Sequence, residues 1–245
     1  MKFGSLFSGI GGIDLGLERA GMTCIWQSEI EPYACQVLAK HWPDIPNLGD
    51  ICDIDWTTVE RADVVVGGYP CQPFSIAGSR RGEDDSRHLW PMFAECIRVV
   101  RPRYALLENV SGHLGLGFGT VHADLAEIGY DARWDCIPAA ALGAPHLRDR
   151  VFVIARDTRA ERRRLMADSN NRRSLDPLRT RWNAPWNGGT DSGRAQWATE
   201  PNVGRVANGI PRRMDRLRAL GNAVVPQVAE HIGNIIMEAD NDRQV

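Results

Sequence analysis

The chain has 245 residues, 43% hydrophobic and 24% charged, with a formal net charge of −2, which suits a globular protein with one main core and at most a second small lobe. No apolar run approaches the roughly 20 residues that span a bilayer, and the N-terminus lacks the apolar stretch of a secretion signal. These features argue against a membrane or secreted protein, so we expect a cytoplasmic one.

The first half of the chain alternates between strand and helix patterns. Periodicity and turn residues predict strands at 3–7, 23–28, 49–51 and 63–66, and helices at 13–21 and 31–41. A Gly-rich turn, Ser8-Gly9-Ile10-Gly11-Gly12, joins the first strand to the first helix. Gly21 is expected to cap that helix at its C-terminal end.

The second half begins with a long segment without periodicity, 68–86, which reads as a functional loop. Beyond it the pattern predicts helices at 87–100, 119–128 and 223–238, and strands at 104–107, 130–137 and 150–155. Residues 156–215 are rich in Arg, Asn, Gly, Pro and Trp, and are expected to form a small irregular lobe.

Alternating strands and helices predict an α/β fold with a doubly wound, mostly parallel sheet. In such sheets ligands bind beyond the carboxyl ends of the strands. The Gly-rich turn, Glu29, Cys71 and Glu108 each follow a predicted strand. Their coincidence at four strand ends indicates an active site at that edge.

The Gly-rich turn and Glu29 suggest an adenosine-type cofactor. Glycines let the backbone approach a ligand, and a carboxylate at the end of the second strand can accept two ribose hydroxyls. A tight turn without a ligand remains an alternative, as does a Glu29 that only carries charge at a helix N-terminus.

Three further groups are candidates for the chemistry. Cys71, flanked by Pro70 and Pro73, could act as a thiolate nucleophile. Glu108 would be partly desolvated, which raises its pKa and suits proton donation, although pairing with an Arg is an equal alternative. Arg148 and Arg150 are two positions apart where a strand is predicted to begin, so both should project to the same side. There they could hold a carbonyl oxygen or phosphate, unless their role is structural.

Cysteine, histidine and charge patterns limit the other functions. No CxxC pair occurs, so neither a zinc site nor a disulfide framework is predicted, and the histidines other than His146, among them His113, show no ligand spacing. Residues 146–218 carry 17 Arg and 8 acidic residues, a local charge of +9 against −11 elsewhere. This asymmetry favours a basic segment facing nucleic-acid phosphates, with a solvated Arg-rich loop as the alternative. Trp182, Trp186 and Trp197 would stack on bases or form the core of the small lobe.

Together these segments resemble the C5-cytosine-specific DNA methyltransferase family in its compact phage and prophage form. The similar segments are, in order, LFSGIGGIDLGLERAG, GGYPCQPFSIAG, DDSRHLWPMF, ENV at 108–110, HLRDR at 146–150 and LGNAVVP at 220–226. The resemblance implies a class I, Rossmann-like methyltransferase fold that uses S-adenosyl-L-methionine (SAM). It also implies double-stranded DNA as substrate and a bacterial or phage-infected host cell.

The resemblance assigns roles to individual residues. The catalytic residues it implies are Cys71, Glu108, Arg148 and Arg150. The cofactor-binding residues it implies are Phe7, Gly9, Gly11, Gly12, Glu29, Ile30, Asp50, Ile51, Pro70, Leu89, Asn222 and Val224. The DNA-binding residues it implies are Gln72, Ser75, Arg80, Arg81 and Arg87. It implies no metal.

The implied mechanism is attack of Cys71 on C6 of a flipped-out cytosine, methyl transfer to C5, loss of the C5 proton and departure of Cys71. Glu108 would protonate or hydrogen-bond N3, and Arg150 would steady the base carbonyl. His146 replaces the family's usual Gln, which puts a loop-supporting contact in question.

The resemblance also predicts the domain division. Residues 1–156 and 216–245 would form the SAM-binding catalytic domain, and 157–215 a small target-recognition region whose core is about 157–204. So short a region suggests a short or loosely defined target sequence. A role in restriction-modification is expected, with or without a cognate endonuclease, and the protein is expected to act as a monomer.

Three other functions remain open. The same fold could methylate tRNA cytosine, although the Cys-Phe-Thr signature of that branch is missing. A non-catalytic SAM- or DNA-binding protein would not need a thiolate and an acid together. A nicotinamide oxidoreductase would explain the Gly-rich turn but not the later motifs.

Overall fold

The computed structural model describes residues 1–70, 89–115, 117–159 and 212–242. Its strands are β1 (Lys2–Leu6), β2 (Thr23–Ser28), β3 (Val64–Gly67), β4 (Tyr104–Val110), β5 (Tyr130–Pro138) and β6 (Asp149–Asp157). Its helices are α1 (Gly12–Arg19), α2 (Pro32–His41), α3 (Trp90–Val100), α4 (Phe118–Ile128), α7 (Arg213–Asn222) and α8 (Pro226–Asn241), with short 3-10 helices η2 (Ser111–Gly115) and η3 (Ala139–Leu142). In this part of the chain, no helix is long and apolar enough to cross a membrane.

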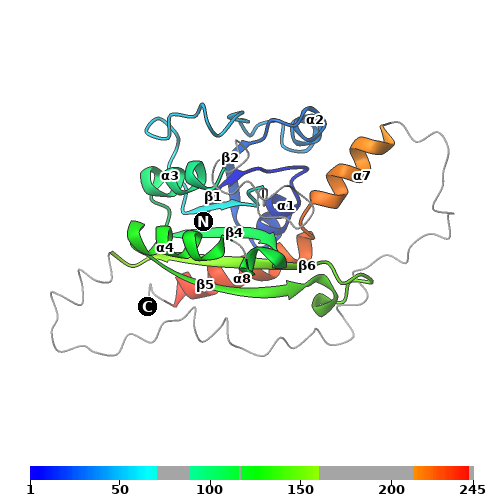
Figure 1. The fold of residues 1–245 in the computed structure, drawn as a ribbon. Coiled ribbons are helices and arrows are strands. Elements are labelled where there is room, and N and C mark those ends of the chain that lie inside the picture. The colour runs from blue at the N-terminus through cyan, green and yellow to red at the C-terminus, as the bar shows by residue number, and fades with distance from the viewer. Residues whose placement is uncertain (71–88, 116, 160–211, 243–245) are drawn as a thin grey trace, which may run out of the picture.

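The strands form one mixed sheet in the order β2-β1-β3-β4-β6-β5 (Figure 1). Neighbouring strands from β2 to β4 are parallel, whereas β6 is antiparallel to both β4 and β5. The predicted α/β, mostly parallel sheet is confirmed. Because β6 runs against its neighbours, its first residues lie beside the last residues of β4.

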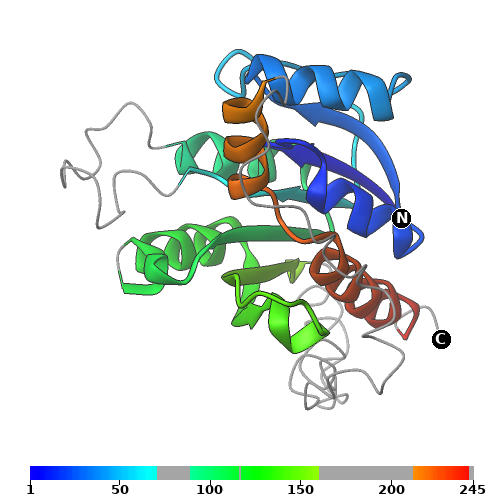
Figure 2. The same ribbon diagram turned by 90° about the vertical axis from the view of Figure 1, so that its right-hand side faces the viewer.

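Helices cover both faces of the sheet, so its central strands are buried on both sides (Figure 2). Val64 and Val66 of β3 belong to the cluster that includes α1 and α8, and Val65 belongs to the cluster that includes α3 and α4. All three valines have zero exposure. The alternation follows from the two-residue repeat of a strand and explains the continuous apolar run in the sequence.

Close helix packing against α1 depends on glycine. A Cβ on Gly16 would come within 2.4 Å of the Pro226 carbonyl oxygen and 2.5 Å of the Ala229 Cβ, so α8 can approach α1 only because Gly16 has no side chain. A Cβ on Gly12 would likewise lie 2.4 Å from the Val224 carbonyl oxygen. The segment before α8 therefore lies directly on the Gly-rich turn.

Three sequence predictions were wrong. Residues 49–51 do not form a strand, because Asp50 accepts a hydrogen bond from the Cys52 amide and closes a turn; the chain near β2 instead makes one parallel bridge, between Gln27 and Asn47. Helix α7 was missed because the pattern around it is strongly polar. The predicted helix at 223–238 begins later, at Pro226, since Ala223 and Val225 are extended.

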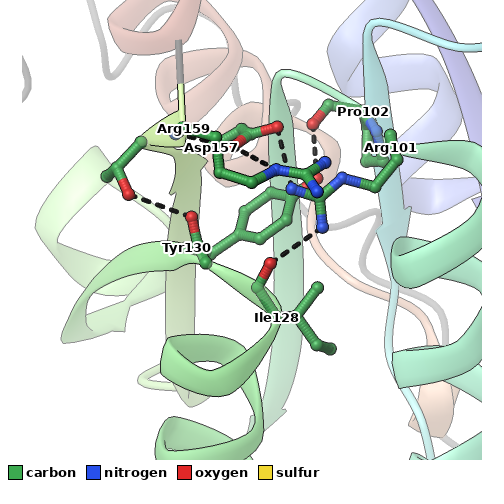
Figure 3. A network of polar contacts seen from close by, with 8 residues as sticks. Arg101, Pro102, Ile128, Tyr130, Asp157 and Arg159 are labelled. Atoms are coloured by element: carbon green, nitrogen blue, oxygen red, sulfur yellow. Dashed lines mark hydrogen bonds and ion pairs between the residues drawn. The ribbon is translucent and has the colours of Figure 1, made fainter. Parts of the chain in front are cut away.

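The end of the sheet opposite the predicted site is held by a polar network (Figure 3). Arg101 ends α3 with a left-handed backbone, φ 56°, and lies 4.9 Å from the centre of the Tyr130 ring. Its guanidinium donates to the Ile128 carbonyl at 2.9 Å and to the Asp157 carboxylate at 3.0 Å. The Tyr130 hydroxyl donates to the Pro102 carbonyl at 2.6 Å. These contacts join α3, α4, β5 and β6 where β6 ends.

Candidate active site

Glu108 is the central titratable group of the candidate site. It lies inside β4, which continues to Val110 rather than ending at Leu107 as predicted, because β6 extends the ladder and pairs Glu108 with Phe152. The residue is only 8% exposed, and its carboxyl lies 3.0 Å from the Arg150 guanidinium. Burial raises the pKa of Glu108 to about 7, although Arg150 and Arg148 oppose the rise. The sequence analysis treated a raised pKa of Glu108 and pairing of Glu108 with an arginine as alternatives. The structure has both.

Arg148 and Arg150 take different partners. β6 begins at Asp149, and Arg148 before it has a positive φ of 34°, so strand alternation does not orient Arg148 as predicted. The Arg148 guanidinium donates to the carbonyls of Gly221, in the last turn of α7, and Ala223, which follows α7. Both arginines still line one cavity. Arg150 thus contacts the acid, whereas Arg148 holds the segment that carries Asn222 and Val224.

The Gly-rich turn is tied to Glu29. Phe7 and Gly9 both have positive φ angles, 52° and 56°. The Gly9 amide donates to Glu29 Oε2 at 2.7 Å, while Oε1 accepts from the amides of Ile30 and Glu31 at 2.8 Å. The Glu29 carboxylate therefore lies at the start of α2, which agrees with the alternative of a helix N-terminal charge. It also borders the Gly-rich turn, which the ribose-binding interpretation requires.

The three predicted cofactor glycines serve different purposes. A Cβ on Gly9 would meet nothing nearer than 3.9 Å, so the turn is open there. A Cβ on Gly11 would lie 2.4 Å from the Trp42 ring, and Gly12 is backed by Val224. Gly9 fits the expected approach of a ligand to the backbone. Gly11 and Gly12 make room for protein atoms at their missing Cβ and also line the cavity described below.

The other described cofactor candidates lie near the ends of strands and helices. The Ser28 hydroxyl donates to the Gly49 carbonyl at 2.7 Å, which places Asp50 and Ile51 beside the end of β2. Ile51 is buried, whereas Ile30 is 63% exposed next to Glu29. Pro70 follows β3, Leu89 precedes α3 and Asn222 ends α7.

A cavity of about 880 Å³ joins the two sets of candidates. From the cofactor set it is lined by Gly11, Gly12 and Val224, and from the catalytic set by Arg148 and Arg150. The remaining lining residues include several that sequence reasoning gave no role, namely Ile10, Leu15, Glu18, Val37, His41, Trp42, Leu220 and Gln227. The sequence carried no signal for this set, because its members come from the Gly-rich turn, α1, the end of α2, α7 and α8 and meet only in the fold. The cavity also contains His146.

Several predicted residues lie outside the described part of the chain. These are Cys71, Gln72, Ser75, Arg80, Arg81 and Arg87, together with Trp182, Trp186 and Trp197. Their roles stay predictions.

The family model described as C-5 cytosine-specific DNA methylase matches residues 1–180. The Type II methyltransferase M.NgoBI of Neisseria gonorrhoeae is 38% identical over 154 residues, which are 61% of this chain and 48% of that protein. M.HgiCII of Herpetosiphon aurantiacus is 37% identical over 164 residues, 62% of this chain and 36% of that protein. The chain therefore spans about half the length, or less, of these curated relatives.

Solved structures give the same fold. An E. coli structure assigned to a DNA modification methyltransferase encoded within a prophage superposes with a TM-score of 0.56 at 27% identity, covering 66% of this chain and 48% of that one. The Dnmt2 methyltransferase of S. pombe gives a TM-score of 0.56 at 20% identity, covering 74% of this chain and 55% of that one, which speaks for the fold alone.

Proposed function

This chain belongs to the C-5 cytosine-specific DNA methylase family, and we propose that it transfers a methyl group from SAM to C5 of a cytosine in double-stranded DNA. The observation that carries the proposal is the Glu108–Arg150 pair. A buried carboxyl with a pKa of about 7 lies 3.0 Å from a guanidinium at the carboxyl end of β4. Such a pair can donate a proton to one position of a planar base and stabilise charge on a neighbouring oxygen.

The residues around the Gly-rich turn fit SAM. Gly9 leaves the backbone open, Glu29 presents a carboxylate to ribose hydroxyls, and the exposed Ile30 offers an apolar surface to a purine. Asn222 and Val224 lie across the turn, held there by Arg148. When bound, SAM supplies an electrophilic methyl group. The chain's own residues bind and orient it.

The proposed steps at cytosine balance without an oxidant or a metal. The Cys71 thiolate adds to C6, and the electron pair moves to C5 while Glu108 hydrogen-bonds or protonates N3. Arg150 stabilises the base carbonyl as negative charge develops. C5 would take the methyl group as the S–CH3 bond of the sulfonium breaks and S-adenosylhomocysteine leaves. Solvent water then accepts the C5 proton, and the C6–sulfur bond breaks to restore the thiolate. The cytosine must leave the base stack for this to occur.

The test is cytosine-methylation sequencing of DNA from a methylase-free bacterial host that expresses the protein. We expect 5-methylcytosine in one short sequence context with the wild type and none with Cys71→Ala, which should still bind SAM. Cys96→Ala is a matched control, because Cys96 lies in the second half of α3, close to Tyr130 at the opposite end of the sheet, and it should retain methylation. An inert wild type would contradict the proposal and favour RNA methylation or a silent binding protein.

The remaining parts of the proposal concern partners and domains. The relatives named above are Type II methyltransferases, which supports a restriction-modification role, with or without a cognate endonuclease. We further propose that the protein acts as a monomer in the cytoplasm. Residues 157–215 would recognise the target, and residues 1–156 with 216–245 would carry catalysis.

A further inference from the structure

The last residues before Pro70-Cys71 are attached to the strand that carries Glu108. The β3–β4 ladder ends at the pair Gly67–Leu107, so no further ladder pair joins these two strands beyond that point. Beyond it, side chains of β4 contact the residues that follow β3. A Cβ on Gly68 would lie 2.6 Å from Glu108 Oε2, and Asn109 Nδ2 donates to the Tyr69 carbonyl at 3.1 Å.

The Tyr69 side chain makes a second connection. Its hydroxyl forms a hydrogen bond 2.7 Å long with Nε2 of His113, a residue of η2 that is 2% exposed. The Tyr69 ring packs against Trp90 and Phe93 of α3, with centroid distances of 5.3 and 6.1 Å. Tyr69 itself is 6% exposed, so ring packing and hydrogen bond together hold it in one position.

We propose that Tyr69 and His113 form a positioning pair that sets the approach of Cys71 to the target base relative to Glu108. The inference rests on the proposed function. Pro70, the one residue between Tyr69 and Cys71, has a fixed φ, so it restricts how the chain can turn after Tyr69. On the other side, η2 directly follows β4, so His113 is tied to Glu108. The pair thus spans the two strand ends that must supply nucleophile and acid together.

The expected effect is on the chemical step rather than on binding. A nucleophile displaced by about 1 Å can lose roughly 100-fold in rate, so we expect Tyr69→Phe to slow methyl transfer about 10- to 100-fold. The Kd for SAM and for DNA should stay unchanged, because neither residue is assigned to either ligand. His113→Leu should have the same effect. The double variant should be no slower than either single variant, because the two residues act as one unit.

The measurement is single-turnover transfer from tritiated SAM to unmethylated bacterial DNA, with enzyme in excess over sites, together with melting temperatures. Tyr130→Phe is the matched control. It also removes a buried tyrosine hydroxyl, which donates to the Pro102 carbonyl at the opposite end of the sheet (Figure 3). We expect it to lower the melting temperature about as much as Tyr69→Phe while transferring at the wild-type rate.

The outcomes separate this inference from the proposed function. A wild type that transfers no methyl group contradicts the proposed function and the inference with it. An active wild type with Tyr69→Phe and His113→Leu at full rate overturns the inference alone. Equal loss of rate in Tyr69→Phe and Tyr130→Phe would also overturn it, because the effect would then be one of stability. If either single variant does not fold, the other decides.

Discussion

At the scale of single residues, the candidate site depends on a carboxyl group whose ionisation is opposed by its surroundings. Glu108 is buried in β4 and close to the backbone of Gly68, and the nearby guanidinium of Arg150 only partly compensates for the loss of water. Its pKa of about 7 leaves much of the group protonated at neutral pH. A group in this state can donate a hydrogen bond, which an ordinary glutamate cannot.

The raised pKa predicts a pH-dependent stability. The folded state holds the Glu108 proton more tightly than the unfolded state, so the contribution to stability is fully present below pH 4.5 and is lost as the pH rises to about 7. Compared with Glu108→Gln, the wild type should therefore lose of the order of 2–3 kcal/mol between pH 4.5 and 8. Urea unfolding of both proteins across this range measures the difference.

The comparison has an internal control. Asp14, a second buried carboxyl whose pKa is raised to about 6, mainly by burial, is present in both proteins, so its effect cancels. Glu95→Gln, at an exposed glutamate that pairs with Arg98 outside the candidate site, is the matched control variant. A wild-type-minus-Glu108→Gln difference that stays constant with pH would contradict the raised pKa.

At the scale of elements, the site is shaped by how closely helices and loops approach the Gly-rich turn. Gly12 and Gly16 lie one helical turn apart on α1, and both face the chain that runs into α8. Gly12, a predicted cofactor-binding glycine, thus serves packing as Gly16 does, which the sequence pattern could not distinguish. Sequence spacing reveals a turn, but the atoms that lie against Gly12 and Gly16 come from residues more than 200 positions away.

The same substitution should act in opposite directions on two helices. Gly16→Ala places a Cβ 2.4 Å from the Pro226 carbonyl oxygen, so α1 and α8 must separate, and we expect a loss of about 1–3 kcal/mol in the free energy of unfolding. Gly119 lies in α4 with no atom within 4 Å of its Cβ position. Gly119→Ala should leave stability unchanged or raise it by up to about 1 kcal/mol. Thermal unfolding of both variants tests the pair, and equal effects would contradict this account of the packing.

At the scale of the whole molecule, the last described helix completes a domain begun by the first strand. α8 buries Val228, Ile232, Ile235 and Ile236 in the same cluster as Phe3 of β1. At the far end of the sheet, the Arg103 guanidinium donates to both oxygens of Asp240 at 2.6 and 2.7 Å. Segments from the two ends of the chain therefore share one core, whatever lies between them.

Removal of α8 should abolish folding of the domain. Four large aliphatic side chains at about 1.5–3 kcal/mol each amount to roughly 6–12 kcal/mol, comparable with the entire 5–15 kcal/mol of a typical domain. A chain that ends at Val225 should show no cooperative unfolding transition by circular dichroism. A chain that ends at Asp242 keeps α8 and should unfold like the full chain. Cooperative unfolding of the shorter chain would mean that α8 is an accessory element.

The sequence by itself determined the alternation of strands and helices, the mostly parallel sheet, and the motifs that identify the family. These features depend on local periodicity and on short spacings, which can be read within a single segment of the chain. Only the tertiary structure decided that β6 runs antiparallel to β4, that Glu108 lies inside a ladder beside Arg150, and that Arg148 turns to Gly221 and Ala223. The same holds for the Tyr69–His113 contact. Each of these pairs residues at least 40 positions apart, and their proximity follows from strand order and packing rather than from any local preference.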